Sequence, residues 1–211
     1  MKHKNNLIII IGREIGSGGR TIARLLAEKY GCQFYDREIL NLAAKESGFN
    51  EKFFEQNDEK KGIFKSLFHI HVPFISDSCF YDNGLSQESL FKMQSDAIRK
   101  AAQKGPCVFV GRCADYVLRD FENVVSFFIT ANMDERIKRV SQRYGYSEQE
   151  SRKLIENGER QRASYYNYYT GKKWGDSRSY DLCINSSILG IEGTMELIGD
   201  FLDKVHIIHN K

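Results

Sequence analysis

Eight residues near the start of the chain have the composition of a phosphate-binding loop. They read Glu14-Ile15-Gly16-Ser17-Gly18-Gly19-Arg20-Thr21 and follow the template G-x-x-x-x-G-K-[ST] of the P-loop, with Glu14 at the first glycine and Arg20 at the lysine. In such a loop the backbone N–H groups point inward, and the dipole of the following helix adds positive potential where a polyphosphate can bind. We expect the phosphates of a ligand to bind Gly16, Ser17, Gly18, Gly19, Arg20 and Thr21.

The two departures from the template bear on the chemistry. Arg20 can replace lysine electrostatically, although its planar guanidinium is wider and always charged. Glu14 would repel phosphate unless its carboxylate is turned away or held by Arg13. The hydroxyl of Thr21 would reach a nucleotide-bound Mg²⁺. The alternative is a dinucleotide-type turn, but residues 16–21 do not supply its G-x-G-x-x-G fingerprint.

Charged residues also follow two later apolar segments. Asp36 and Arg37 come after the second segment, and Arg112 and Asp115 come after the third. In an open parallel sheet, ligands bind beyond the carboxyl ends of strands. We therefore expect these four residues to bind an acceptor, with the arginines gripping its phosphate. The alternative is that the aspartates only cap helices and the arginines lie on the surface.

A third group of charges suggests the catalytic arginines. Catalysis of phosphoryl transfer consists largely of positioning the transferred group and neutralising its charge, and a mobile lid that carries arginines would do both while excluding water. Arg160 and Arg162 are the candidates, together with Arg20 of the loop. The alternative is a solvated helix face, which describes the nearby Arg152 and Lys153 well.

The order of elements predicts how these groups are positioned. Five short apolar segments are expected to be strands: Leu7–Ile11, Gln33–Tyr35, Cys107–Val110, Val125–Ile129 and Asp181–Asn185. Amphipathic helical patterns separate them, which predicts a three-layer α/β fold with a five-stranded parallel sheet. Helices are expected to start at Asn132 and Ser147, each followed three residues later by glutamate. The stretch 47–89 is too long for a loop and predicts an inserted lobe.

Composition excludes several other classes of protein. The chain has 211 residues and a net charge of +3, with basic and acidic residues mixed along it, which does not indicate a nucleic-acid-binding domain. Its five cysteines lack C-x-x-C spacing, and its five histidines form no metal-binding set. No apolar run approaches the ~18 residues of a membrane span, and the first residues do not have the layout of a signal peptide. We expect a cytoplasmic protein; the sequence does not indicate an oligomeric state.

The motifs in this order resemble the cytidylate kinase-like branch of the nucleoside monophosphate kinases over nearly the whole chain. The resemblance is carried by residues 15–20, 34–38, 111–116, 162–166, 169–176 and 180–185. It implies a single P-loop kinase domain with a CORE at about 1–46, 90–158 and 181–211, an acceptor-binding insertion at about 47–89 and a LID at about 159–180. It also implies the reaction ATP + CMP (or dCMP) ⇌ ADP + CDP, with magnesium.

The resemblance suggests roles for single residues as well. Arg112 is similar to the arginine of the family's G-R-D motif, which grips the acceptor phosphate, and Arg160 and Arg162 are similar to LID arginines that bridge the two substrates. Well-understood cytidylate kinases have lysine where this chain has Arg20, glycine where it has Glu14 and aspartate where it has Cys113. These differences affect the expected preference for cytosine more than they affect the expectation that the protein is a kinase. A kinase of another small-molecule acceptor, or a nucleotide-binding regulatory protein with little turnover, are the alternatives.

Overall fold

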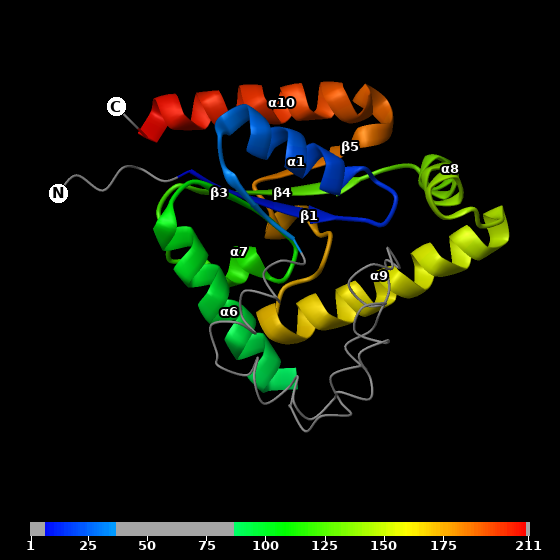
Figure 1. Ribbon diagram of the computed structural model, residues 1–211, viewed down its shortest axis with the longest axis horizontal. Helices are drawn as coiled ribbons and strands as arrows, with labels where there is room; N and C mark the ends of the chain where they lie inside the picture. Colours follow the sequence, from blue (N-terminus) through cyan, green and yellow to red (C-terminus); the bar gives the residue numbers. More distant parts are fainter. Residues whose placement is uncertain (1–6, 37–86, 210–211) are drawn as a thin grey trace, which may run out of the picture. The chain divides into compact units, whose positions relative to one another are not determined.

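The computed structural model describes residues 7–36 and 87–209 (Figure 1). The predicted acceptor-binding insertion lies outside the described residues except for its last three positions, and Arg37 lies outside them as well. The chain divides into two compact units, Met1–Asp36 with Ala101–Lys211, and Arg37–Lys100. The first unit carries all the described candidate site residues.

The elements alternate as the sequence predicts. Their order is β1 (Ile8–Arg13), α1 (Gly19–Tyr30), β2 (Gln33–Tyr35), α6 (Gln87–Lys104), β3 (Cys107–Val110), α7 (Ala114–Val117), β4 (Val124–Thr130), α8 (Met133–Tyr144), α9 (Glu148–Thr170), the 3-10 helix η2 (Ser177–Ser179), β5 (Leu182–Asn185) and α10 (Ser186–His209). The helix α10 contains a kink at Gly190, whose φ is 71°. None of the helices in the described ranges combines the length and the apolar character needed to cross a membrane.

The strands form one five-stranded sheet in the order β2-β3-β1-β4-β5. All four neighbouring pairs are parallel, so the predicted parallel sheet is confirmed. The chain leaves the central strand β1 toward one edge of the sheet, returns through β3, and then crosses to β4 on the other side. Ligands bind at such a reversal, beyond the carboxyl ends of the strands. The residues that follow β1 and β3 therefore lie at the place where a site is expected.

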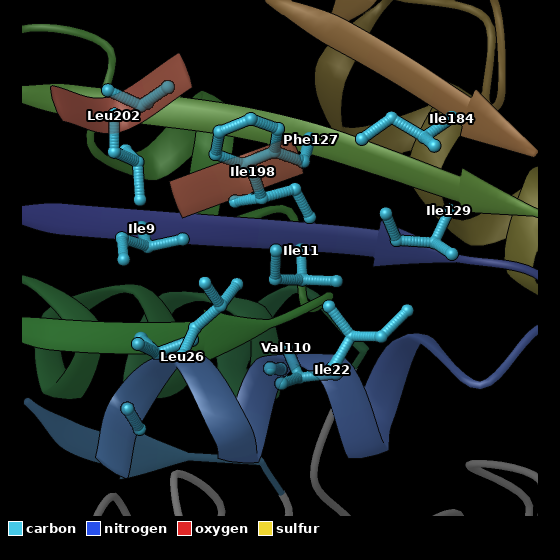
Figure 2. Packing of buried hydrophobic residues seen from close by; sticks show 14 of the residues in the cluster. Ile9, Ile11, Ile22, Leu26, Val110, Phe127, Ile129, Ile184, Ile198 and Leu202 are labelled. Atoms are coloured by element: carbon cyan, nitrogen blue, oxygen red, sulfur yellow. The ribbon is translucent and has the colours of Figure 1, made fainter. Parts of the chain in front are cut away.

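One face of the sheet is covered by α1 and α10, which lie side by side (Figure 1). Apolar side chains of β1, β3 and β4 meet Ile22 and Leu26 of α1 and Ile198 and Leu202 of α10 in one buried cluster (Figure 2). Each pair of helix residues is four apart, which puts both on one face of its helix. Full burial of such a side chain stabilises the fold by about 1.5–3 kcal/mol, so this core fixes α1 firmly behind the loop that precedes it.

The other face carries aromatic contacts from the chain after α9. The Phe128 ring of β4 lies 5.1 Å from the Trp174 ring and 5.0 Å from the Tyr180 ring. The side chain of Tyr166 in α9 stacks on Tyr180 at 6.1 Å. The end of the predicted LID region is thus packed against the sheet in this structure, and α9 continues as one helix through its expected boundary at residue 159.

The two predicted helix starts have different local structures. Ser147 is the N-cap of α9 and forms a capping box with Glu150, as the spacing predicts. Asn132 occupies the N-cap position of α8, but its side chain makes no capping hydrogen bond. Its Oδ1 instead accepts a hydrogen bond from Nδ2 of Asn185 at 2.9 Å, which ties the start of α8 to the end of β5.

Candidate functional site

The glycine loop, residues 14–21, connects β1 to α1. Gly16 and Gly18 have φ values of 78° and 80°, which is the left-handed region that glycine adopts without strain. A Cβ on Gly16 would also lie 2.7 Å from the carbonyl oxygen of Arg136. The helix α1 begins at Gly19, with Gly18 as its N-cap. The predicted strand–glycine loop–helix arrangement is confirmed.

The carbonyl groups of the loop are held by hydrogen bonds, whereas several of its N–H groups have no partner among the residues that the structure describes. Four of these hydrogen bonds come from side-chain donors: Ser17 Oγ to Glu14 O at 2.9 Å, Arg136 Nε to Ile15 O at 2.8 Å, Arg139 Nη1 to Gly16 O at 3.1 Å and Ser186 Oγ to Ser17 O at 2.6 Å. Within the described residues, no hydrogen-bond acceptor faces the N–H groups of Gly16, Gly18, Arg20 and Thr21. Unpaired N–H donors at a helix N-terminus are what an anion-binding loop requires.

Arg20 reaches from the first turn of α1 to Asp36, just beyond β2. Its Nε donates a hydrogen bond to Asp36 Oδ2 at 2.5 Å, and Nη2 of Arg13 lies 3.6 Å from Asp36 Oδ1. Asp36 is buried, and burial alone would raise the pKa of its carboxyl. The positive charges of Arg13, Arg20 and Arg112 outweigh burial and hold that pKa below its ordinary value. Asp36 is therefore a charged centre around which arginines gather.

The chain after β3 has an unusual backbone. Gly111, Arg112 and Cys113 all have positive φ values, of 72°, 61° and 55°. A left-handed residue other than glycine costs about 1–3 kcal/mol, and such strain is concentrated at functional sites. A Cβ on Gly111 would overlap Nη1 of Arg13, so the absence of a side chain there leaves room for the Arg13 guanidinium. The turn brings Arg112 close enough to Asp36 to lower its pKa.

Arg162 of α9 joins this group from another part of the chain. Its Nη1 donates a hydrogen bond to the carbonyl oxygen of Arg13 at 3.0 Å. Burial, together with the positive charges of Arg13 and Arg112, lowers the pKa of the Arg162 guanidinium well below its ordinary value. An arriving anion would relieve this repulsion. We refer to Arg13, Arg20, Arg112 and Arg162, gathered around Asp36, as the arginine cluster.

The structure separates the two arginines predicted from α9. Arg160 is exposed, and its Nη2 donates to Oδ1 of Asn157 on the same helix. Because residues two apart on a helix face in nearly opposite directions, only Arg162 turns toward the arginine cluster. Thr21 is exposed in the first turn of α1, beside the free N–H groups of the loop. Roles for Arg160, Arg162 and Thr21 in catalysis remain predictions.

Asp115, the remaining predicted acceptor residue, is almost completely enclosed. Its carboxyl has an exposed fraction of 8%, accepts a hydrogen bond from the Tyr166 hydroxyl at 2.6 Å and lies 3.9 Å from Lys172 Nζ. Burial raises its pKa, although Tyr166 and Lys172 both favour the charged form. This aspartate links α7 to the end of α9 and to the segment after it. It is in position to hold that segment beside α7.

Replacing Tyr166 with phenylalanine should lower the free energy of unfolding by about 1–3 kcal/mol at neutral pH, because it leaves a buried carboxylate without its hydroxyl donor. The hydrogen bond favours the charged form, so its loss raises the pKa of Asp115 further. A raised folded-state pKa means that the folded protein holds the proton more tightly, so the destabilisation should shrink as the pH falls through that pKa. Urea unfolding across pH measures this.

The control for this prediction is Tyr168→Phe, since Tyr168 is 69% exposed on the same helix. Its free energy of unfolding should match that of the wild type at every pH. A loss in Tyr166→Phe that stays constant from neutral to acid pH would contradict the assignment of the effect to Asp115.

Three arginines that hold the site were not predicted from the sequence. The sequence offered Arg13 only as a possible partner for Glu14, and nothing in it singled out Arg136 and Arg139. The one sequence signal for Arg136 and Arg139 is that they are two cations spaced three residues apart, in a helix that starts at the carboxyl end of a strand. In residues 7–36 and 87–209, no three His, Cys, Asp or Glu side chains come together as a metal site. The four described cysteines are free thiols.

The family model and similar curated proteins both point to cytidylate kinases. The sequence model of the cytidylate kinase-like family matches residues 8–188. A cytidylate kinase from Pyrococcus horikoshii is 26% identical over 95% of this chain and 90% of its own length, and one from Thermococcus kodakarensis is 27% identical over the same shares.

Solved structures agree on the fold. An uncharacterized protein from Eubacterium ventriosum has a TM-score of 0.71 and 31% identity, covering 93% of this chain and 98% of its own. Shikimate kinase from Bacteroides thetaiotaomicron has a TM-score of 0.53 at 15% identity, with the same coverage. At that identity the second likeness shows the fold alone. Together these structures confirm the predicted α/β fold of P-loop kinases.

Proposed function

Because the chain belongs to the cytidylate kinase-like family, we propose that it transfers the γ-phosphoryl group of ATP to a nucleoside monophosphate, with CMP or dCMP as the favoured acceptor. The observation that carries this proposal is the arginine cluster beside the glycine loop. Four guanidinium groups from β1, α1, the turn after β3 and α9 surround one described carboxylate. Such an excess of positive charge is suited to binding the phosphates of ATP and the phosphate of the acceptor next to each other.

The proposed chemistry is a direct in-line transfer without a covalent enzyme intermediate. The unpaired N–H groups of the glycine loop would bind the phosphates of ATP, and Arg20 would neutralise charge on them. Arg112 would hold the phosphate of the acceptor, while Arg162 would lie between the two substrates and stabilise the charge that spreads over the transferred group. Asp36 would keep Arg13 and Arg20 at fixed positions through its ion pairs with them, and would attract the nearby charge of Arg112.

Magnesium would enter with ATP. Among the described residues, the exposed hydroxyl of Thr21 lies next to the unpaired N–H groups of the loop, whereas the buried Ser17 hydroxyl is already hydrogen-bonded to Glu14 O and Gly19 N. The described residues include no cluster of carboxylates that could hold the ion by itself. This donor set fits Mg²⁺, which usually keeps several waters and binds largely through substrate phosphates. When bound, the ion would neutralise charge on the phosphates.

The proposed division of the chain follows the family. The CORE would consist of residues of about 1–46, 90–158 and 181–211. The acceptor-binding insertion would be about 47–89, and the LID would be about 159–180. Arg37 would assist Arg112 at the acceptor phosphate, and Asp115 would lie near the acceptor's base or ribose. The proposed preference for cytosine rests on the relatives named cytidylate kinase.

The regulatory alternative loses its main support in this structure. It rested on Glu14, whose carboxylate would repel ATP if it faced the loop interior. Oε2 of Glu14 lies 3.1 Å from Nη1 of Arg136, so its charge is compensated. The sequence offered two alternatives, a carboxylate turned away or one held by Arg13; in the structure the ion-pair partner is Arg136 of α8.

A panel of acceptors tests the proposal. Purified protein would be incubated with ATP, Mg²⁺ and one acceptor at a time (CMP, dCMP, UMP, AMP, GMP, shikimate or gluconate), with ADP release as the readout. We expect ADP release with nucleoside monophosphates, and the highest kcat/KM with CMP or dCMP. Release with shikimate or gluconate alone would replace the proposal by another small-molecule kinase. ATP binding without release for any acceptor would favour the regulatory alternative.

A further inference from the structure

Glu14 occupies the first glycine position of the loop template, yet its carboxylate faces away from the arginine cluster. Its Oε2 accepts hydrogen bonds from the Thr130 hydroxyl and from the Ala131 N–H at 3.3 Å, and lies 3.1 Å from Arg136 Nη1. These partners belong to the end of β4, the chain after it and α8. Glu14 therefore attaches the start of the loop to the neighbouring strand and helix.

Arg136 is the centre of this attachment. Its exposed fraction is 4%, and three of its nitrogen atoms have different partners. Nε donates to the carbonyl oxygen of Ile15 at 2.8 Å, Nη1 faces Glu14, and Nη2 pairs with Glu159 Oε1 of α9. A planar guanidinium with fixed donor directions is suited to holding several groups in one geometry.

Glu159 extends the connection to the catalytic region. It lies three residues before Arg162 in α9, so the two side chains are neighbours on one face of the helix. Arg162 in turn donates to the carbonyl oxygen of Arg13. The helix α9 is thus attached at two points to residues 13–15 of the chain, once through Arg136 and once directly.

We propose that Glu14, Arg136 and Glu159 form a positioning bridge that holds the glycine loop and Arg162 at the mutual position required for phosphoryl transfer. The inference rests on the proposed function and adds three positioning residues to it. None of them would touch substrate. Glu14 is then a structural replacement for the template glycine, with its charge compensated by Arg136.

The bridge predicts an effect of charge that packing alone would not produce. Its two carboxylates and one guanidinium carry a net charge of −1. Arg136→Met would leave both carboxylates uncompensated beside the loop, giving −2. Adding Glu14→Gln restores −1 with a side chain of the same size, whereas the packing change at residue 136 stays the same in both variants.

The experiment measures ATP affinity by calorimetry without acceptor, kcat by ADP release, and the melting temperature. Arg136→Met should weaken ATP binding about tenfold, through repulsion between the uncompensated carboxylates and the phosphates. The double variant Glu14→Gln/Arg136→Met should recover most of that affinity. The control is Arg143→Met, an exposed arginine of the same helix, which should bind ATP and turn over as the wild type does.

A single variant keeps the inference testable if Arg136→Met fails to fold. Glu14→Gln retains the size and hydrogen-bonding capacity of the side chain but loses the ion pair with Arg136. We expect unchanged or tighter ATP binding with kcat lowered on the order of 10- to 100-fold, since small misplacements of catalytic groups reduce rates by such factors. A structural role alone would not separate affinity from turnover in this way.

The outcomes separate the bridge from the proposed function. Wild-type kcat in Glu14→Gln, or no recovery of ATP affinity in the double variant, would overturn the bridge even if nucleoside monophosphates are phosphorylated. Absence of transfer by the wild type to every acceptor would overturn the proposed function. Recovery of ATP affinity in the double variant would in that case still support the charge compensation at the loop.

Discussion

Replacing Arg162 with glutamine is expected to lower kcat/KM for phosphoryl transfer about 10³-fold, the range associated with an arginine that stabilises the transferring group. Arg162 is the one predicted α9 arginine that joins the arginine cluster, and burial with two neighbouring cations lowers its pKa. Because its charge is already unfavourable without an anion, removing it should leave the folded protein at least as stable. Steady-state kinetics and thermal unfolding measure the two effects.

Arg152→Gln is the matched control, since Arg152 is an exposed arginine nearly three turns earlier on α9. It should have wild-type kinetics. Arg160→Gln should fall between the two, with an effect at least about tenfold smaller than that of Arg162→Gln, because Arg160 points to solvent. Equal losses for Arg160→Gln and Arg162→Gln would show that the catalytic geometry differs from the one in this structure.

Replacing Arg20 with alanine should reduce phosphoryl transfer by about 10²- to 10³-fold, as removal of one preorganised charge donor at a transition state does. The fold should remain, because Asp36 keeps the charges of Arg13 and Arg112 nearby. The loss of transfer would be electrostatic, because Arg20 supplies the cation that the P-loop template provides through lysine. The measurement is ADP release at saturating ATP and acceptor, with circular dichroism as the test of folding.

The comparison for Arg20 is Arg24→Ala. Arg24 is an exposed residue one turn further along α1, with its guanidinium 5.9 Å from the centre of the Phe34 ring. Activity in that variant should be unchanged. If Arg20→Ala were fully active, residues 14–21 would not serve as the phosphate loop of a kinase.

The fold was predictable because its signals are local and strong. Continuous apolar segments such as Cys107–Val110 indicate strands buried on both faces, and all four residues of that segment are buried. The glycines of the loop predict a turn, because Gly16 and Gly18 have positive φ values that other residues adopt only with strain. Position at the carboxyl end of a strand also predicted the meeting of Asp36 and Arg112, because parallel strands bring those ends together.

What could not be predicted depends on pairings between distant residues. The compensation of Glu14 comes from Arg136, more than 120 positions later, and no sequence pattern connects the two. The difference between Arg160 and Arg162 depends on the rotation of α9, which its contacts with other elements decide. The hydrogen bond from Arg20 to Asp36 could not be predicted either, since the P-loop template places the residue at position 20 only toward phosphate. Arg37 and most of the predicted insertion lie outside the described residues.

Transfer of a labelled phosphate tests the central claim most directly. The wild-type protein would be given ATP labelled at the γ-phosphate, Mg²⁺ and CMP, and the products would be separated by chromatography. The account predicts that the label appears in CDP, and that Arg162→Gln slows its appearance far more than Arg152→Gln does. Label that remains in ATP or appears only as free phosphate, with CMP and the other nucleoside monophosphates all unmodified, would contradict it.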